Sequence, residues 1–275
     1  MSSPKRFYII TGKGGVGKTS VALALVDYLQ QAGKKAKYYY LHENKTTDPQ
    51  AEATTFDKFL DKLKITYKGL ELYREVQTYV ALKLKSNTIA HWVVRTPFFK
   101  AMFNMLPGFS YLIYLGSILQ DLHDDNELIA VLDSPASGHA LTMLEATGNF
   151  REIFKKGVIF DDTTKMLNFL TSEGTTKLVI VSLPTEMSVH ESQDLVSQVD
   201  ESGLKDICLV LNNTFCNMKD LADKDLPHFL ERKITLEKQV IKDNQLDNFP
   251  KIPYSTSEEQ FAIIKDLSRY MEELI

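Results

Sequence analysis

The chain has 275 residues, of which 44% are hydrophobic and 25% charged, and its formal net charge is −4. This length allows one α/β domain, or one domain with a subdomain, around a large buried core. The slightly acidic balance disfavours a nucleic acid or an anionic membrane as the main partner. The two cysteines, Cys208 and Cys216, are too few and too oddly spaced for a disulfide framework or a C-x-x-C metal site.

The sequence predicts a cytoplasmic location. The longest apolar stretch near the middle of the chain, 109–119, is too short to span a bilayer, so no transmembrane segment is expected. Residues 1–6 run straight into a β-rich segment and leave no room for a secretory signal. We expect reduced thiols and no nucleic acid partner.

The stretch 7–20 combines a β-rich run, a glycine-rich turn and a helix-compatible run. Gly12, Gly17, Lys18 and Thr19 match the phosphate-loop spacing G-x-x-x-x-G-K-S/T in this context. Backbone N–H groups can wrap a triphosphate only where side chains are absent, and the following helix adds its dipole. The pattern predicts that Lys18 reaches the β and γ oxygens and that the Thr19 hydroxyl binds Mg²⁺. The predicted nucleotide-binding residues of the loop are Gly12, Lys13, Gly14, Gly15, Val16, Gly17, Lys18, Thr19 and Ser20.

Lys13 is an additional lysine directly after the first loop glycine. The resulting segment, K-G-G-V-G-K-T, resembles the deviant phosphate loop of the signal-recognition and Min-type nucleoside triphosphatases. In that class this lysine reaches across a dimer interface to the nucleotide of the partner subunit. The alternative is that Lys13 is simply solvated at a position that the motif leaves open.

Strand and helix patterns alternate before residue 76. The expected elements are a helix over 19–31 that closes at Gly33, a strand over 36–41, a polar loop over 42–49, a helix over 56–63 and a strand over 70–73.

The segment 76–122 departs from this alternation. It is helical in pattern and rich in large apolar residues, and Pro107-Gly108 divides it into two helices. We therefore expect a single phosphate-loop ATPase domain over 1–275 with an inserted helical subdomain over 76–122. Its Met/Phe stripe is either ordinary helix core or an apolar groove for a partner peptide or cargo.

After residue 122 the alternation of strands and helices resumes. The expected strands are 128–132, 177–183 and 207–211; the expected helices are 140–146, 188–199 and much of 220–241, and the segment 249–253 precedes a final amphipathic helix to residue 275. The fold class that follows is α/β, a doubly wound and mainly parallel sheet. Ligands of such sheets bind at the carboxyl ends of the strands.

Asp133 and Asn212 both lie at such strand ends. A carboxylate in the position of Asp133 can hold Mg²⁺ through water, and the upstream phosphate loop favours this role. The alternative for Asp133 is a residue that only begins a turn.

Further motifs resemble the arsenite-pump ATPase and tail-anchored-protein targeting ATPase family. The segment D-S-P-A-S-G-H at 133–139 is similar to the family's second switch, D-T-A-P-T-G-H, and 182–192 is similar to its L-P-E-E-M-x-V-x-E-T segment. Leu211-Asn212-Asn213 resembles its V-N-Q strand end. The chain would be a short, single-module member of this family.

The resemblance implies an ATP- and Mg²⁺-dependent homodimer in which hydrolysis resets a helical subdomain that binds a hydrophobic cargo or membrane-protein partner. By position, Lys13 would contact the partner subunit's ATP and Asp133 would be the metal carboxylate of the second switch. Asn212 would face the adenine, with Pro253 nearby.

The first switch of the family departs from its usual form here. The family places an aspartate at the end of the second strand, in D-P-A-H, where it orients the attacking water. In this chain the strand ends His42-Glu43, and an Asp-Pro pair occurs only at Asp48-Pro49. Spacing from Lys18 favours Glu43 as the catalytic carboxylate, whereas residue identity favours Asp48. Two other functions remain open, a Min/Par-type positioning ATPase and a nucleotide-binding assembly module with little hydrolysis.

Overall fold

The computed structural model describes residues 4–42, 55–97, 105–106, 108–135, 137–200, 203–218 and 226–275. Within these residues the strands form one seven-stranded sheet of order β3-β2-β4-β1-β5-β6-β7, and every printed pairing is parallel. The strands are β1 (Phe7–Gly12), β2 (Ala36–Leu41), β3 (Tyr67–Leu70), β4 (Ile129–Asp133), β5 (Thr176–Ser182), β6 (Ile207–Thr214) and β7 (Lys251–Pro253). The α/β, parallel fold expected from the sequence is confirmed.

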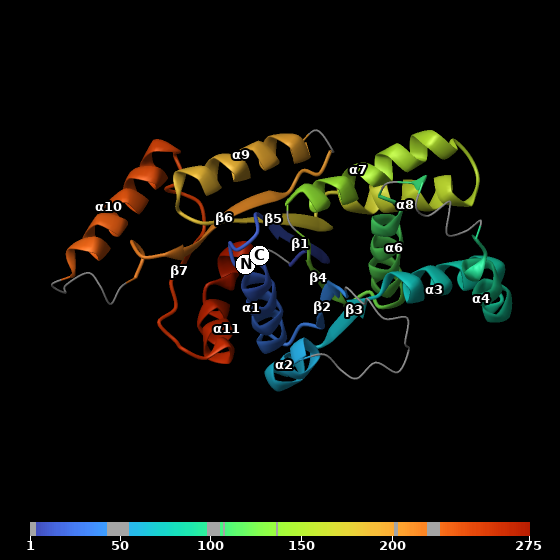
Figure 1. Cartoon of the computed structure of the whole chain (residues 1–275), viewed down its shortest axis with the longest axis horizontal. Coiled ribbons are helices and arrows are strands. Elements are labelled where there is room, and N and C mark those ends of the chain that lie inside the picture. Colours follow the sequence, from blue (N-terminus) through green and yellow to red (C-terminus); the bar gives the residue numbers. More distant parts are fainter. Residues whose placement is uncertain are drawn as a thin grey trace.

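Helices cover both faces of the sheet (Figure 1). They are α1 (Lys18–Gln31), α2 (Thr55–Leu63), α3 (Leu72–Leu84), α4 (Asn87–Arg95), α6 (Phe109–Asp124), α7 (Ser137–Phe154), α8 (Val158–Thr171), α9 (Glu186–Asp200), α10 (His228–Asp243), α11 (Gln260–Ser268) and the 3₁₀ helix η2 (Met271–Leu274). The side chains of α1, α2, α11 and η2 share one buried cluster, and those of α3, α4 and α6 to α10 share the other.

The central strand β1 is buried along its whole length because its side chains pack in both clusters. Successive side chains of a strand point to opposite faces. Accordingly, Phe7 and Ile9 pack in the cluster of α6 to α9, whereas Tyr8 and Ile10 pack against α1. Burial on both faces explains why this strand is a continuous apolar run rather than an alternating one.

Several local features differ from the sequence expectations. The third strand covers Tyr67–Leu70, and Leu72 already begins α3, so a strand over 70–73 does not form. The helix α8 has no counterpart in the sequence prediction. The last helix ends at Ser268 and is followed by η2, so it does not continue to residue 275.

Only helices are described between β3 and β4, namely α3, α4 and α6. They agree with the helical pattern of 76–122, but α3 begins before this range and α6 ends after it. The expected division into two helices is wrong, because the chain also breaks between α3 and α4, where Ser86 caps the start of α4. In addition, α6 packs on α7 and α8, which follow β4. The assignment of 76–122 as a subdomain of its own therefore stays a prediction. None of the described helices has the length and apolar character needed to cross a membrane.

The contact between α1 and α11 contains a buried charge, which gives a prediction about stability. The Asp27 carboxylate is buried on α1, accepts a hydrogen bond from Gln31 and pairs with the Lys265 ammonium of α11. Because Lys265→Met would leave this carboxylate without its cation, we expect the free energy of unfolding to fall by about 2–3 kcal/mol. Urea unfolding measures the change.

Two variants serve as controls for this prediction. Lys238→Met removes an exposed lysine of α10 and should leave stability within about 0.5 kcal/mol of the parent. The double variant Asp27→Asn with Lys265→Met should regain part of the loss, because the buried charge is then gone. A Lys265→Met protein as stable as the parent would contradict the prediction.

Candidate functional site

The turn between β1 and α1 depends on two glycines that lie against the sheet. A Cβ on Gly12 would stand 2.2 Å from the carbonyl oxygen of Val181, and a Cβ on Gly17 would stand 2.3 Å from Nδ2 of Asn212. Both glycines also have positive φ angles, of 143° and 93°. By contrast, a Cβ on Gly14 or Gly15 would meet nothing within 4 Å. The turn is thus tight on its inner side and open on its outer side.

The start of α1 presents backbone donors to this turn. Gly17 precedes the helix without a side-chain cap, and the first helical bond runs from the Val21 N–H to the Gly17 carbonyl. The N–H groups of the first helical turn therefore have no acceptor within the helix, which makes this end suited to an anion. Lys18 Nζ donates to the Lys13 carbonyl at 3.0 Å, so the ammonium lies over the turn. Burial lowers the pKa of Lys18, and the nearby Asp133 opposes this effect.

Asp133 lies at the carboxyl end of β4, which pairs with β1 so that Ile10 is its register partner. Its Oδ2 accepts hydrogen bonds from the Thr19 hydroxyl at 2.7 Å and the Tyr38 hydroxyl at 2.8 Å. Burial raises the pKa of Asp133, whereas the bonds from Thr19 and Tyr38 and the charge of Lys18 lower it. The structure thus brings together Lys18, Thr19 and Asp133, the three side chains to which the sequence assigned phosphate and metal.

The donor set at this point fits Mg²⁺. A hard cation prefers oxygen ligands, and Mg²⁺ is commonly held by one or two protein oxygens together with phosphate oxygens and water. The Thr19 hydroxyl and the Asp133 carboxylate supply such oxygens within one hydrogen bond of each other. Among the described residues, no group of three or more His, Cys, Asp or Glu forms a metal cluster elsewhere.

Lys13 forms an ion pair within its own chain. Its Nζ lies 2.6 Å from Oε1 of Glu191 on α9, and both side chains are roughly half exposed. In this single chain the lysine therefore points toward α9, and its contact with a partner subunit stays a prediction. Because the pair is exposed, it holds Lys13 only weakly.

Asn212 lies beneath the turn, at the end of β6. It is buried, and its Nδ2 donates to the Val16 carbonyl at 2.8 Å. Its Oδ1 is buried and has no partner in the described structure. Pro253 lies on the neighbouring strand, where it is the register partner of Thr214. The structure thus places Asn212 against the loop itself, and the adenine contact assigned to Asn212 and Pro253 stays a prediction.

Glu43 and Asp48, the two candidates for the first switch, lie outside the described residues. The choice between these two residues as the catalytic carboxylate therefore stays a prediction from the sequence.

Tyr38 is a site residue that the sequence analysis missed. It is fully buried on β2, next to β4, and its hydroxyl reaches the same carboxylate oxygen as Thr19. Burial and Asp133 raise the pKa of Tyr38 well above its usual value, so its phenol stays protonated and donates this hydrogen bond. The sequence does show a tyrosine in the second predicted strand and an aspartate at the end of a later strand. Only the strand order, which the sequence does not give, places these two residues side by side.

The fold and this loop define a phosphate-loop nucleoside triphosphatase. A parallel sheet carries a glycine-rich turn after its central strand, a helix leaves the turn, and a carboxylate from the adjacent strand end bonds to the Thr19 hydroxyl.

Comparison with known proteins identifies the family. A family model described as an anion-transporting ATPase matches residues 5–167, and the chain belongs to that family. An arsenical pump-driving ATPase of Acidiphilium multivorum is 27% identical over 262 residues, and one of Escherichia coli is 26% identical over 262 residues. Each alignment covers 91% of this chain but only 41% of the relative. A relative from Aquifex aeolicus, provisionally named an arsenical pump-driving ATPase 2, is 22% identical over 311 residues that cover 97% of this chain and 99% of that protein.

The raised pKa of Asp133 predicts how stability depends on pH. Its folded-state pKa lies above the ordinary value of 3.8, so ionisation near neutral pH opposes folding, and this penalty disappears once the pH is below that value. Asp133→Asn keeps an acceptor for Thr19 and Tyr38 without the charge. We expect this variant to have a higher melting temperature than the parent at pH 7 without nucleotide, and the gain to shrink toward pH 4. A variant that loses stability at pH 7 but not at pH 4 would contradict this.

Proposed function

We propose that the chain binds ATP with Mg²⁺ and hydrolyses it to ADP and phosphate. The observation that carries this proposal is the hydrogen bond from Thr19 to Asp133 beside a turn that has open space at Gly14 and Gly15. Membership of a family of ATPases supports ATP as the substrate. Because the chain spans only about 41% of the first relatives, their whole activity is not transferred to it.

The chain's own residues would act by positioning and by charge. The amides of the turn and of the start of α1 bind the phosphates, and Lys18 neutralises charge on the β and γ oxygens. Thr19 and Asp133 hold Mg²⁺, which when bound supplies positive charge to the transferring phosphoryl group. Glu43 or Asp48 orients the attacking water. No covalent intermediate is required, because phosphoryl transfer depends mainly on positioning.

The acting unit in this proposal is a homodimer. Lys13 would leave Glu191 and contact the nucleotide of the partner subunit, as the form of the loop suggests. The exposed position of this ion pair supports such a change, since little energy opposes it. The helices of 76–122 would then transmit the nucleotide state to a hydrophobic cargo or a membrane-protein partner. The expected location is the cytoplasm.

Turnover should depend on Lys18. Lys18→Ala should lower kcat about 100-fold or more, because it removes the cation next to the transferring phosphate. Phosphate release at saturating Mg²⁺–ATP measures the effect. Lys34→Ala removes an exposed lysine of the turn after α1 and should turn over at the parental rate. Equal rates of phosphate release for Lys18→Ala and the parent would contradict the proposed ATP hydrolysis at this loop.

The water-orienting carboxylate can be assigned in the same assay. Glu43→Gln and Asp48→Asn remove one candidate charge each while keeping the side chain's size. The variant of the acting residue should lose kcat about 100-fold yet still bind ATP, and the other should turn over normally. If both variants keep the parental rate, neither residue orients the water.

ATP-dependent dimerisation should depend on Lys13. Lys13→Ala should abolish the ATP-dependent increase in molar mass seen by light scattering, because the contact across the interface is lost. Glu191→Gln is the matched control, since it breaks the ion pair within the chain and leaves Lys13 in place. It should dimerise like the parent. If Glu191→Gln also fails to dimerise, the dimer requires the Lys13–Glu191 ion pair within each chain. The proposed contact of Lys13 across the interface is then refuted.

A further inference from the structure

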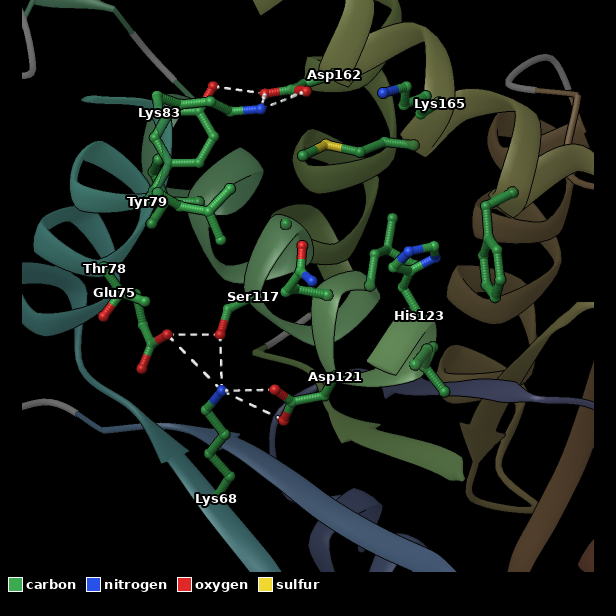
Figure 2. Close-up of a pocket in the computed structure, with 18 of the residues that line it drawn as sticks. Lys68, Glu75, Thr78, Tyr79, Lys83, Ser117, Asp121, His123, Asp162 and Lys165 are labelled. Atoms are coloured by element: carbon green, nitrogen blue, oxygen red, sulfur yellow. Dashed lines mark hydrogen bonds and ion pairs between the residues drawn. The ribbon is translucent and has the colours of Figure 1, made fainter. Parts of the chain in front are cut away.

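A pocket of about 660 Å³ lies among α3, α6 and α8 (Figure 2). The pocket and the phosphate loop lie toward opposite ends of the strands. Arg6 and Asn126, which line it, precede β1 and β4, whereas the loop follows β1 and Asp133 is the last residue of β4. The pocket thus lies toward the amino ends of the strands, and its volume is within the range of small-molecule sites.

Apolar side chains form much of the pocket wall. They come from all three helices and include Leu82, Ile113, Leu119, Met166 and Phe169. Gly116 of α6 also lines the pocket, and a Cβ at this position would stand 2.9 Å from Cε of Met166. This absence of a side chain in mid-helix brings Met166 close to the backbone of α6. The wall therefore suits the apolar body of a ligand.

One polar cluster lies where β3 meets α3 and α6 (Figure 2). Lys68 Nζ lies 2.9 Å from Oγ of Ser117 and 3.2 Å from Oδ1 of Asp121. The Ser117 hydroxyl donates to the buried Glu75 at 2.5 Å, and the Tyr39 hydroxyl donates to Asp121 at 2.8 Å. Lys37 also lies 3.4 Å from Asp121. Two lysines thus balance the two carboxylates of this cluster.

A second polar cluster joins α3 to α8. Lys83 Nζ lies 2.6 Å from Oδ2 of Asp162, and the Tyr79 hydroxyl donates to the same oxygen at 2.8 Å. The charge of Asp162 is therefore balanced as well. No carboxylate of the pocket is left to attract a cationic ligand.

The cations of the pocket are not all balanced. Lys165 is exposed on α8, and neither it nor Arg6 forms an ion pair within the described part of the chain. Arg6 donates instead to the backbone carbonyls of Leu122 and Asp125, and its Nε is buried without a partner. The pocket thus has surplus positive charge, which favours an anion.

We propose that this pocket is a binding site for an amphipathic organic anion, whose apolar body lies along α6 and α8 and whose charged group lies near Lys165. The apolar wall, the balanced carboxylates and the surplus cations together select this class over a cationic or uncharged molecule. The site is separate from the proposed nucleotide site and does not depend on ATP hydrolysis.

Isothermal titration calorimetry of the full chain with two probes of equal chain length tests this proposal. Decanoate, kept below its micelle concentration, should bind saturably at one site. Decyltrimethylammonium carries the opposite charge and should bind at least tenfold more weakly. Equal affinity for the two probes, or no saturable binding of decanoate, would overturn the proposal.

Two variants locate the site. Thr78→Phe adds bulk to the wall and removes only a bond within α3, from the Thr78 hydroxyl to the Arg74 carbonyl. Lys165→Glu reverses the exposed charge. Each should weaken decanoate binding at least fivefold, whereas Lys58→Glu, an exposed lysine of α2 on the other face of the sheet, should stay within twofold of the parent. Decanoate binding that Thr78→Phe and Lys165→Glu leave unchanged would place the anion elsewhere and refute this site.

Discussion

The hydrogen bond between the Thr19 hydroxyl and the Asp133 carboxylate joins the two halves of the candidate nucleotide site. It exists because β4 pairs with β1 in parallel register, which brings Asp133 beside the strand that leads into the turn. The turn can then bring Thr19 back to the carboxylate only if Gly12 and Gly17 lack side chains, since a Cβ at either position would collide with β5 or β6 residues. The site therefore needs both the parallel register of β4 with β1 and the two glycines of the turn.

Strand β2 connects this site to the opposite face of the sheet. Tyr38 and Tyr39 are consecutive, so their side chains project to opposite faces. The Tyr38 hydroxyl bonds to Asp133, and the Tyr39 hydroxyl bonds to Asp121 in the pocket of α3, α6 and α8. Two adjacent tyrosines of β2 thus hold a carboxylate on each side of the sheet. The nucleotide site and the proposed anion site share this strand as their structural support.

Sequence reasoning recovered the features that depend on local pattern. The continuous apolar runs predicted β1, β4, β5 and β6, because such a signal lies within a few residues of the chain. The loop spacing likewise pointed to Lys18 and Thr19, whose roles in binding stay predictions. It misplaced β3, whose segment Tyr-Lys-Gly-Leu lies at a sheet edge and lacks a clear apolar alternation. It also missed the role of Tyr38 and the contact of Asn212 with Val16, because strand order and contacts across the fold do not appear in a linear pattern.

We expect the turn after β1 to bind the phosphates of a nucleotide while Thr19 and Asp133 hold a metal ion. A crystal structure of the chain with Mg²⁺ and a non-hydrolysable ATP analogue would test this. We expect a triphosphate against the backbone of residues 13–19, with the Thr19 hydroxyl turned from Asp133 toward the metal. A turn without nucleotide at saturating analogue, or a nucleotide bound elsewhere on the chain, would refute this binding mode.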